Sequence, residues 1–141
     1  MPIIIDANCT GYFTPPKSDK DKYILKRLLE GKNKIAYNES LITEITNQEF
    51  IKIIVSLNRF GIAIRYDTKH QEQKIMSMNI KSDDPHIIAL AIDSDSMVIY
   101  TNDSNLIADL KNSNISKKRR KIIKSNTRYR VVKHLLNRFS P

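Results

Sequence analysis

The stretch DDPHIIALAIDSDSMVIYTND, residues 83–103, decides the fold class of this chain. Asp84 is suited to the N-cap of a helix and Pro85 to its first position, and the apolar residues 87–91 predict that this helix is buried. The run MVIY, residues 97–100, is typical of a strand that is buried on both faces. A buried helix that leads into a buried strand indicates a parallel sheet covered by helices.

The same alternation of strands and helices extends along the chain. Ser18 is suited to cap a helix that ends near Gly31, and another helix begins at Asn38 or Ser40 and passes through Glu44. This alternation predicts a parallel sheet with helices on both faces, which binds ligands at the carboxyl ends of its strands. We expect the other strands at PIIID (2–6), KIAY (34–37), GIAIRYD (61–67) and RYRVV (128–132). We expect the other helices near 50–61, 69–78, 103–111 and 133–139.

Length and composition limit the class of protein. The 141 residues fit one domain, residues 1–141, with no internal repeat. The N-terminal run MPIIIDANC lacks the basic start of a signal peptide, and no apolar run approaches the ~18 residues of a membrane span. Because Cys9 is the single cysteine, an internal disulfide cannot form. These features predict a cytoplasmic protein that does not enter a membrane.

Charge is distributed unevenly along the chain, whose formal net charge is +9. Residues 1–110 hold all fifteen acidic residues and thirteen Lys and Arg, whereas residues 111–141 hold eleven Lys and Arg and no acid. We call residues 111–141 the basic C-terminal segment. A basic segment beside an acidic body is expected when a polyanion is held next to an acidic site, although it is also compatible with a solvated surface segment.

Four acids follow strands or begin helices that a parallel sheet would bring to one edge. Asp6 ends the first strand, Asp103 follows MVIYT, Asp84 precedes a helix, and Glu44 lies on the helix after the second strand. Carboxylates at close range repel one another unless a cation lies between them. Because the set offers oxygen ligands and no zinc-like spacing of His or Cys, the metal expected is Mg²⁺ or Mn²⁺. Such ions recruit phosphates and activate water for phosphoryl displacement.

Neighbouring residues have a functional and a structural interpretation. Asn8 and Thr101 are suited to orient a carboxylate or a metal-bound water, and they are equally suited to turns. His86 could touch a phosphate, but a histidine in a first helical turn is more often packed or hydrogen-bonded. Cys9 has no motif that links it to a histidine, which favours a buried thiol over a nucleophile. Asp84 and Asp103 could also be ordinary helix caps, so the argument depends on the whole set of acids.

Four blocks resemble, in order, the acidic motifs of PIN-domain ribonucleases, a family that includes the toxins of toxin-antitoxin pairs. The blocks are IIIDANC (3–9), NESLITEI (38–45), DDPHIIALA (83–91) and VIYTND (98–103), and the resemblance extends from residue 3 to about 110. It implies a three-layer α/β/α sandwich with a central, mainly parallel sheet. It also implies cleavage of RNA that depends on Mg²⁺ or Mn²⁺, with Asp6, Glu44, Asp84 and Asp103 as the matching acids. Asn105 stands where many members carry a further acid, and Asp83 adjoins Asp84.

The expected activity is therefore a metal-dependent endoribonuclease, a phosphodiester hydrolase with water as the nucleophile and no covalent intermediate. Asp6, Asp84, Asp103 and Glu44 would hold the metal. A toxin with an antitoxin partner is the biology that the resemblance implies, and a homodimer is compatible with it. The basic residues expected to bind RNA, or else to dock an antitoxin, are Lys117, Lys118, Arg119, Arg120, Lys121, Lys124, Arg128 and Arg130.

Two other function classes remain open at the level of the sequence. The first is an RNA-binding module whose acids no longer cleave. The second is a phosphatase of the haloacid-dehalogenase type, because DANCT (6–10) is one residue from the signature D-x-D-x-T. Asn8 replaces the second acid of that signature, the general acid. A nuclease would shorten RNA, a binding module would shift RNA without cutting it, and a phosphatase would release inorganic phosphate.

Overall fold

A five-stranded, all-parallel sheet forms the centre of the protein, whose computed structural model describes residues 1–140. The strand order is β3-β2-β1-β4-β5, and every neighbouring pair runs parallel. The strands are β1 (Ile3–Ile5), β2 (Ile35–Tyr37), β3 (Ala63–Arg65), β4 (Val98–Tyr100) and β5 (Lys121–Ile123). Their β-branched residues pack into the core, which confirms the interpretation of IIID and MVIY as buried strands.

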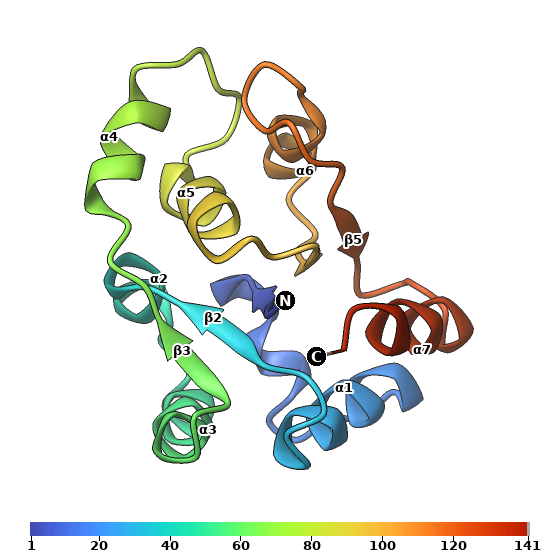
Figure 1. Ribbon diagram of the computed structural model, residues 1–141. Coiled ribbons are helices and arrows are strands. Elements are labelled where there is room, and N and C mark those ends of the chain that lie inside the picture. Colours follow the sequence, from blue (N-terminus) through green and yellow to red (C-terminus); the bar gives the residue numbers. More distant parts are fainter. Residues whose placement is uncertain (141) are drawn as a thin grey trace.

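Helices cover both faces of the sheet and make a three-layer α/β/α sandwich, as expected from the sequence. Figure 1 shows α4, α5 and α6 on one side and α1, α3 and α7 on the other. The longest helix, α3, has 12 residues, and within residues 1–140 no helix is long and apolar enough to cross a membrane. The helices are η1 (Ala7–Tyr12, a 3-10 helix), α1 (Asp19–Leu29), α2 (Glu39–Glu44), α3 (Gln48–Arg59), α4 (Lys69–Met76), α5 (Pro85–Ser94), α6 (Ser104–Lys111) and α7 (Tyr129–Arg138).

Helix α5 is the most deeply buried helix of the sandwich. Its apolar residues from Ile87 to Ala91 are fully enclosed, because α5 packs against α4 as well as the sheet. Pro85 occupies its first turn, and the helix ends at Asp95, which adopts a left-handed conformation with φ of 56°. The continuous apolar run therefore predicted the burial of this helix correctly.

The sequence prediction at the C-terminal end was wrong. RYRVV was expected to be a strand, but residues 129–138 form the single helix α7, and the last strand is Lys121–Ile123. Val132, Leu135 and Leu136 have the i, i+3, i+4 spacing of one helical face, and all three are buried. The strand lies instead inside the basic run SKKRRKIIK, where two isoleucines provide its apolar residues.

The order of the strands creates a switch point between β1 and β4. The chain proceeds from β1 to β2 and β3 in one direction, then returns to the other side of β1 to form β4 and β5. Connections on either side of such a point lie on opposite faces, which leaves a crevice at the carboxyl ends of the two strands. Ile5 lies opposite Tyr100 in this pair, so the residues that follow each strand, Asp6 and Thr101, are neighbours.

A buried ion pair joins α1 to the centre of the sheet. Lys20 and Asp21 are both buried, and Lys20 Nζ lies 3.1 Å from Asp21 Oδ1. The hydroxyl of Tyr100 on β4 donates to Asp21 Oδ1 at 2.8 Å and accepts from Lys20 Nζ at 3.0 Å. Each charge is thereby paired and hydrogen-bonded, as a charge in a protein interior must be.

We expect Lys20→Met to lower the free energy of unfolding by about 3 kcal/mol, because the substitution leaves the buried Asp21 carboxylate without its cation. Chemical denaturation of the variant and the parent measures the difference. Lys22→Met is the matched control, since Lys22 is exposed on the same helix and should change stability by less than about 0.5 kcal/mol. Equal effects of the two substitutions would show that the ion pair does not anchor α1.

Candidate metal centre

Asp6 lies at the carboxyl end of β1, where the pairing with β4 fixes its position. Its backbone N–H donates to Tyr100 O at 2.9 Å, and its side chain is 4% exposed. The hydroxyl of Thr101 donates to Asp6 Oδ2 at 2.8 Å and also accepts from the backbone N–H of Asp103 at 3.1 Å. One buried threonine thus orients the first acid and positions the backbone of another, as expected for Thr101.

Asp103 caps α6 and keeps part of its carboxylate unused. Oδ1 accepts from the backbone N–H groups of Asn105 at 2.9 Å and Leu106 at 3.2 Å. Both bonds go to the same oxygen, so capping does not use Oδ2. The capping interpretation and the ligand interpretation of Asp103 are therefore compatible.

Asp84 has the backbone position of an N-cap without the side-chain bond of one. Its residue precedes α5, but its carboxyl accepts no capping hydrogen bond from the backbone of the described residues. The prediction that Asp84 is the N-cap residue is confirmed, although its side chain makes no capping bond. Pro85 at the first position of α5 carries no N–H, so this position leaves no backbone donor unsatisfied. One of the carboxyl oxygens of Asp84 lies within 4.8 Å of a carboxylate oxygen of Glu44.

The pKa of Asp84 is raised by burial and by the charges of the other three expected acids. Burial is the largest cause that raises this pKa, from an ordinary value of 3.8 to about 7, followed by the negative charges of Asp6 and Glu44. Asp103 raises it further, because its carboxylate accepts a hydrogen bond from protonated Asp84 and repels the ionised form. The structure therefore places Asp84 close to Glu44, and near enough to Asp6 and Asp103 at the switch point for their charges to raise its pKa. Such a cluster is relieved by a proton or by a cation.

His86 joins this cluster, although the sequence analysis did not assign it to the metal. It lies in the first turn of α5 and is 6% exposed, and its Nε2 atom lies against Oε1 of Glu44, the last residue of α2. One ligand atom each from Glu44, Asp84 and His86 lies within 4.8 Å of the other two. In the sequence, the only sign of this role is that His86 follows Asp84 by two residues. The role itself depends on the contact between α2 and α5, which the sequence does not reveal.

Asn38 holds α2 and α5 together beside the cluster. Its Oδ1 accepts from the N–H of Leu41 at 2.9 Å, which caps α2, and its Nδ2 donates to the carbonyl of His86 at 3.1 Å. Nδ2 also donates to the hydroxyl of Thr68 at 2.8 Å. A single buried amide therefore determines how the helix that carries Glu44 meets the first turn of α5.

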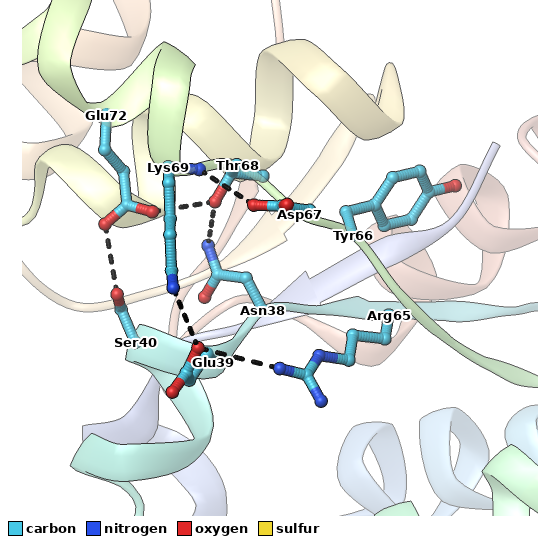
Figure 2. Close-up of a pocket in the computed structure, with 9 residues that line it drawn as sticks. All are labelled: Asn38, Glu39, Ser40, Arg65, Tyr66, Asp67, Thr68, Lys69 and Glu72. Carbon is cyan, nitrogen blue, oxygen red and sulfur yellow. Dashed lines mark hydrogen bonds and ion pairs between the residues drawn. The ribbon is translucent and has the colours of Figure 1, made fainter.

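A cavity of about 270 Å³ lies behind Asn38, at the carboxyl ends of β2 and β3 (Figure 2). Glu39 lies 3.6 Å from Arg65 and 3.7 Å from Lys69, so the cations of this cavity already face a carboxylate. The residues that line it are Asn38, Glu39, Ser40, Arg65, Tyr66, Asp67, Thr68, Lys69 and Glu72. The four acids of the cluster are not in that list, so the cavity is a separate feature of the same edge.

Asn8 and Cys9 do not join the site. Asn8 lies in η1 with its side chain exposed, so the structure does not hold it against the carboxylates in the way that it holds Thr101. Cys9 is a buried free thiol, as expected. Burial and the charge of Asp6 raise the pKa of Cys9 to about 12, which makes the thiol a poor nucleophile at neutral pH.

Strand β5 separates the basic C-terminal segment into two parts. One part lies at the amino ends of the strands and the other at their carboxyl ends. Lys117, Lys118 and Arg119 precede the strand, and Lys118 pairs with Asp95 at the far end of α5 from Asp84. The loop after the strand lies at the edge of the acids, where the N–H of Ser125 donates to Asn102 Oδ1 at 2.9 Å. The expected single patch is thus two patches, and the exposed residues on the acidic edge are Lys124, Arg128 and Arg130.

Arg120 was expected to contact RNA, but the structure buries it. Its guanidinium donates to the carbonyls of Ala91 at 3.0 Å and Lys118 at 3.2 Å, and to the hydroxyl of Ser116. Burial lowers the pKa of this guanidinium. Arg120 therefore joins the loop before β5 to the end of α5 and does not offer its charge to a ligand. Lys121 begins β5 and is half-buried.

Comparison of the chain with protein-family models, with curated proteins and with solved structures found no match. The function of the cluster is therefore inferred from its geometry, its charges and the resemblance of its motifs. The geometry consists of four carboxylates and one imidazole at the switch point of a parallel sheet.

The raised pKa of Asp84 predicts how stability depends on pH without metal. Above about pH 4 the unfolded chain ionises this carboxyl freely, whereas the folded protein resists ionisation up to about pH 7, so stability falls as the pH rises through this window. Asp84→Asn removes the effect. With chelator present, the variant should gain at least about 1 kcal/mol relative to the parent between pH 4 and pH 8, or ~3 °C in Tm, after allowance for solvent screening.

Thermal unfolding across this pH range measures the gain. Asp83→Asn is the control, because Asp83 is an exposed neighbour whose removal should shift the melting temperature by a constant amount. A constant difference for Asp84→Asn as well would show that the acids do not interact.

Proposed function

We propose that this protein is a divalent-metal-dependent endoribonuclease of the PIN-domain type. The observation that carries the proposal is the position of Asp84, which lies close to Glu44 and His86 and whose pKa is raised by the charges of Asp6, Glu44 and Asp103. Parallel sheets bind their ligands at the carboxyl ends of their strands. The four acids are also the residues that match the acidic motifs of PIN-domain ribonucleases, in the same order along the chain.

The donor set fits a small divalent cation. Four carboxylates repel one another, and the structure also leaves the Nε2 atom of the buried His86 without a hydrogen-bond partner among residues 1–140. Cations of the Mg²⁺ and Mn²⁺ type satisfy clusters of this composition. When bound, such a cation supplies Lewis-acid chemistry, because it attracts phosphate oxygens and offsets the negative charge that develops on them.

The protein's own residues would prepare the site for that chemistry. Thr101 holds the Asp6 carboxylate in one orientation, and the capping bonds of Asp103 hold its Oδ1 in place. Asp84 retains a proton near neutral pH in the absence of a cation, so cation binding has to displace that proton. Metal affinity should therefore increase as the pH rises from 6 to 8.

Exposed positive charge at the same end of the sheet supports RNA as the substrate. Lys124, Arg128 and Arg130 are exposed near the loop that contacts Asn102, the residue before Asp103. A phosphodiester chain that enters the site would pass basic groups on one side and the metal ligands on the other. Service as the toxin of a toxin-antitoxin pair is the biological role that accords with the motif resemblance. RNA binding without cleavage is the alternative that the following assay separates from it.

Cleavage of a fluorescently labelled RNA tests the activity. We expect shortening of the RNA with Mg²⁺ or Mn²⁺, complete loss with EDTA, and loss of at least about 100-fold in rate for Asp6→Asn, because the amide removes one charged ligand. Asp83→Asn should cleave like the parent. Undiminished cleavage in EDTA would overturn the metal mechanism, and a gel shift without shortening would favour the binding module. Release of inorganic phosphate from a phosphomonoester would favour the phosphatase.

The two basic patches give a matched pair of variants for RNA binding. In an Asp6→Asn background, Lys124→Ala with Arg128→Ala should weaken binding of single-stranded RNA. The slope of log affinity against log salt should become shallower by about 1.4, which is about 0.7 for each lost phosphate contact. Lys117→Ala with Arg119→Ala removes the same charge from the opposite edge and should leave the slope unchanged. If the second pair alone flattens the slope, RNA enters along the amino edge of the sheet.

A further inference from the structure

The geometry points to His86 as a nitrogen ligand of the metal centre, which makes that centre selective for Mn²⁺ over Mg²⁺. The inference deepens the proposed function and rests on it in one respect, namely that the acids at the switch point hold a divalent cation. It adds a residue that is not one of the four acids, and it decides between the two metals that the carboxylates alone leave equivalent.

The unpartnered nitrogen of His86 is the first observation. The side chain is 6% exposed, and within residues 1–140 its Nε2 is one of two buried side-chain polar atoms without a hydrogen-bond partner. The other is Nε of Arg120, whose terminal nitrogens are bonded. A buried polar atom without a hydrogen bond lowers the stability of the folded protein. A cation in the cluster would use the lone pair of this nitrogen and remove that cost.

The convergence of three different donors is the second observation. The ligand atoms of Glu44, Asp84 and His86 lie within 4.8 Å of one another. Two ligands that are each about 2.1 Å from one ion are roughly 3 to 4.2 Å apart. A shared ion would therefore need movements of about half an ångström, with Nε2 of His86 and Oε1 of Glu44, which lie against each other, moving apart. An ion pair between Glu44 and His86 would explain why these two side chains are close. It would not explain why the carboxyl of Asp84 lies beside both.

The scaffold restricts the imidazole to this place. His86 is in the first turn of α5, and its carbonyl accepts the hydrogen bond from Asn38 that ties α5 to the helix of Glu44. Nε2 lies against Oε1 of Glu44, yet the contact lacks hydrogen-bond geometry. The ring is therefore held among the acids by the backbone rather than by a side-chain hydrogen bond to Nε2.

Ligand chemistry connects this geometry to the choice of metal. Mg²⁺ takes oxygen ligands and rarely accepts imidazole, whereas Mn²⁺ binds carboxylates and also accepts a histidine nitrogen. Loss of His86 should therefore weaken Mn²⁺ binding much more than Mg²⁺ binding. Loss of a carboxylate should weaken both.

Electron paramagnetic resonance of the full chain with Mn²⁺ tests the inference without any activity assay. We expect spin-echo modulation from a directly bound nitrogen in the parent, its loss in His86→Ala, and its retention in His70→Ala, a control histidine that is exposed on α4. The dissociation constant for Mn²⁺ should rise at least about tenfold in His86→Ala. The Mg²⁺ constant, obtained by competition, should stay within about threefold.

A second preparation covers the case in which His86→Ala does not fold. In the variant His70→Ala with His134→Ala, His86 is the one remaining histidine, so labelling with nitrogen-15 histidine changes the modulation only if His86 is bound. Mn²⁺ that binds without nitrogen modulation would overturn the inference and leave the carboxylate metal site intact. Failure of the parent protein to bind Mn²⁺ or Mg²⁺ would instead overturn the proposed function itself.

Discussion

In the parallel pair β1–β4, Ile5 lies opposite Tyr100, so the residues that follow the two strands, Asp6 and Thr101, meet at the carboxyl edge of the sheet. The chain then leaves β1 toward one face and β4 toward the other, as Figure 1 shows for α1 and α6. Asp84 and Glu44 lie close together beside this divergence. The arrangement of the acids is thus a consequence of strand register and strand order, and each acid needs only to occupy the right position along the chain.

Electrostatic repulsion among the carboxylates at the ends of β1 and β4 is offset by stabilising interactions elsewhere in the fold. A carboxyl whose pKa is raised to about 7 destabilises the folded protein at neutral pH unless a cation is bound. The enclosed helix α5, the β-branched strands and the buried Lys20–Asp21 pair provide the packing and the satisfied charge that tolerate it. Functional sites commonly retain a local cost of this kind, which is the reason why neutralising a ligand can stabilise a protein that it inactivates.

The sequence predicted most of the fold, because the features that carry it are local. Continuous apolar runs marked β1 and β4, and shorter or alternating apolar patterns marked β2 and β3. Ser18, Asn38 and Gly31 marked helix ends that the structure confirms. The strand expected at RYRVV was wrong, since a strand of three residues within a basic run gives a weaker signal than the helical spacing that follows it. Asp6, Asp84 and Asp103 could be selected because each adjoins a strand end or a helix start, and Glu44 because its block NESLITEI resembles a family motif. His86 and Arg120 could not be interpreted, because their roles depend on contacts between α2 and α5 and between α5 and the loop before β5.

The claim that the acids at the switch point form a metal centre is tested most directly by a crystal structure of the protein soaked in Mn²⁺. Anomalous scattering locates the ion independently of any assumption about activity. The account predicts an anomalous peak about 2.0–2.3 Å from carboxylate oxygens of Asp84 and Glu44 and from Nε2 of His86, with Asp6 and Asp103 on its other side. Mn²⁺ found only on exposed acids elsewhere, with the carboxyl edge of β1 and β4 empty at saturating metal, would contradict it.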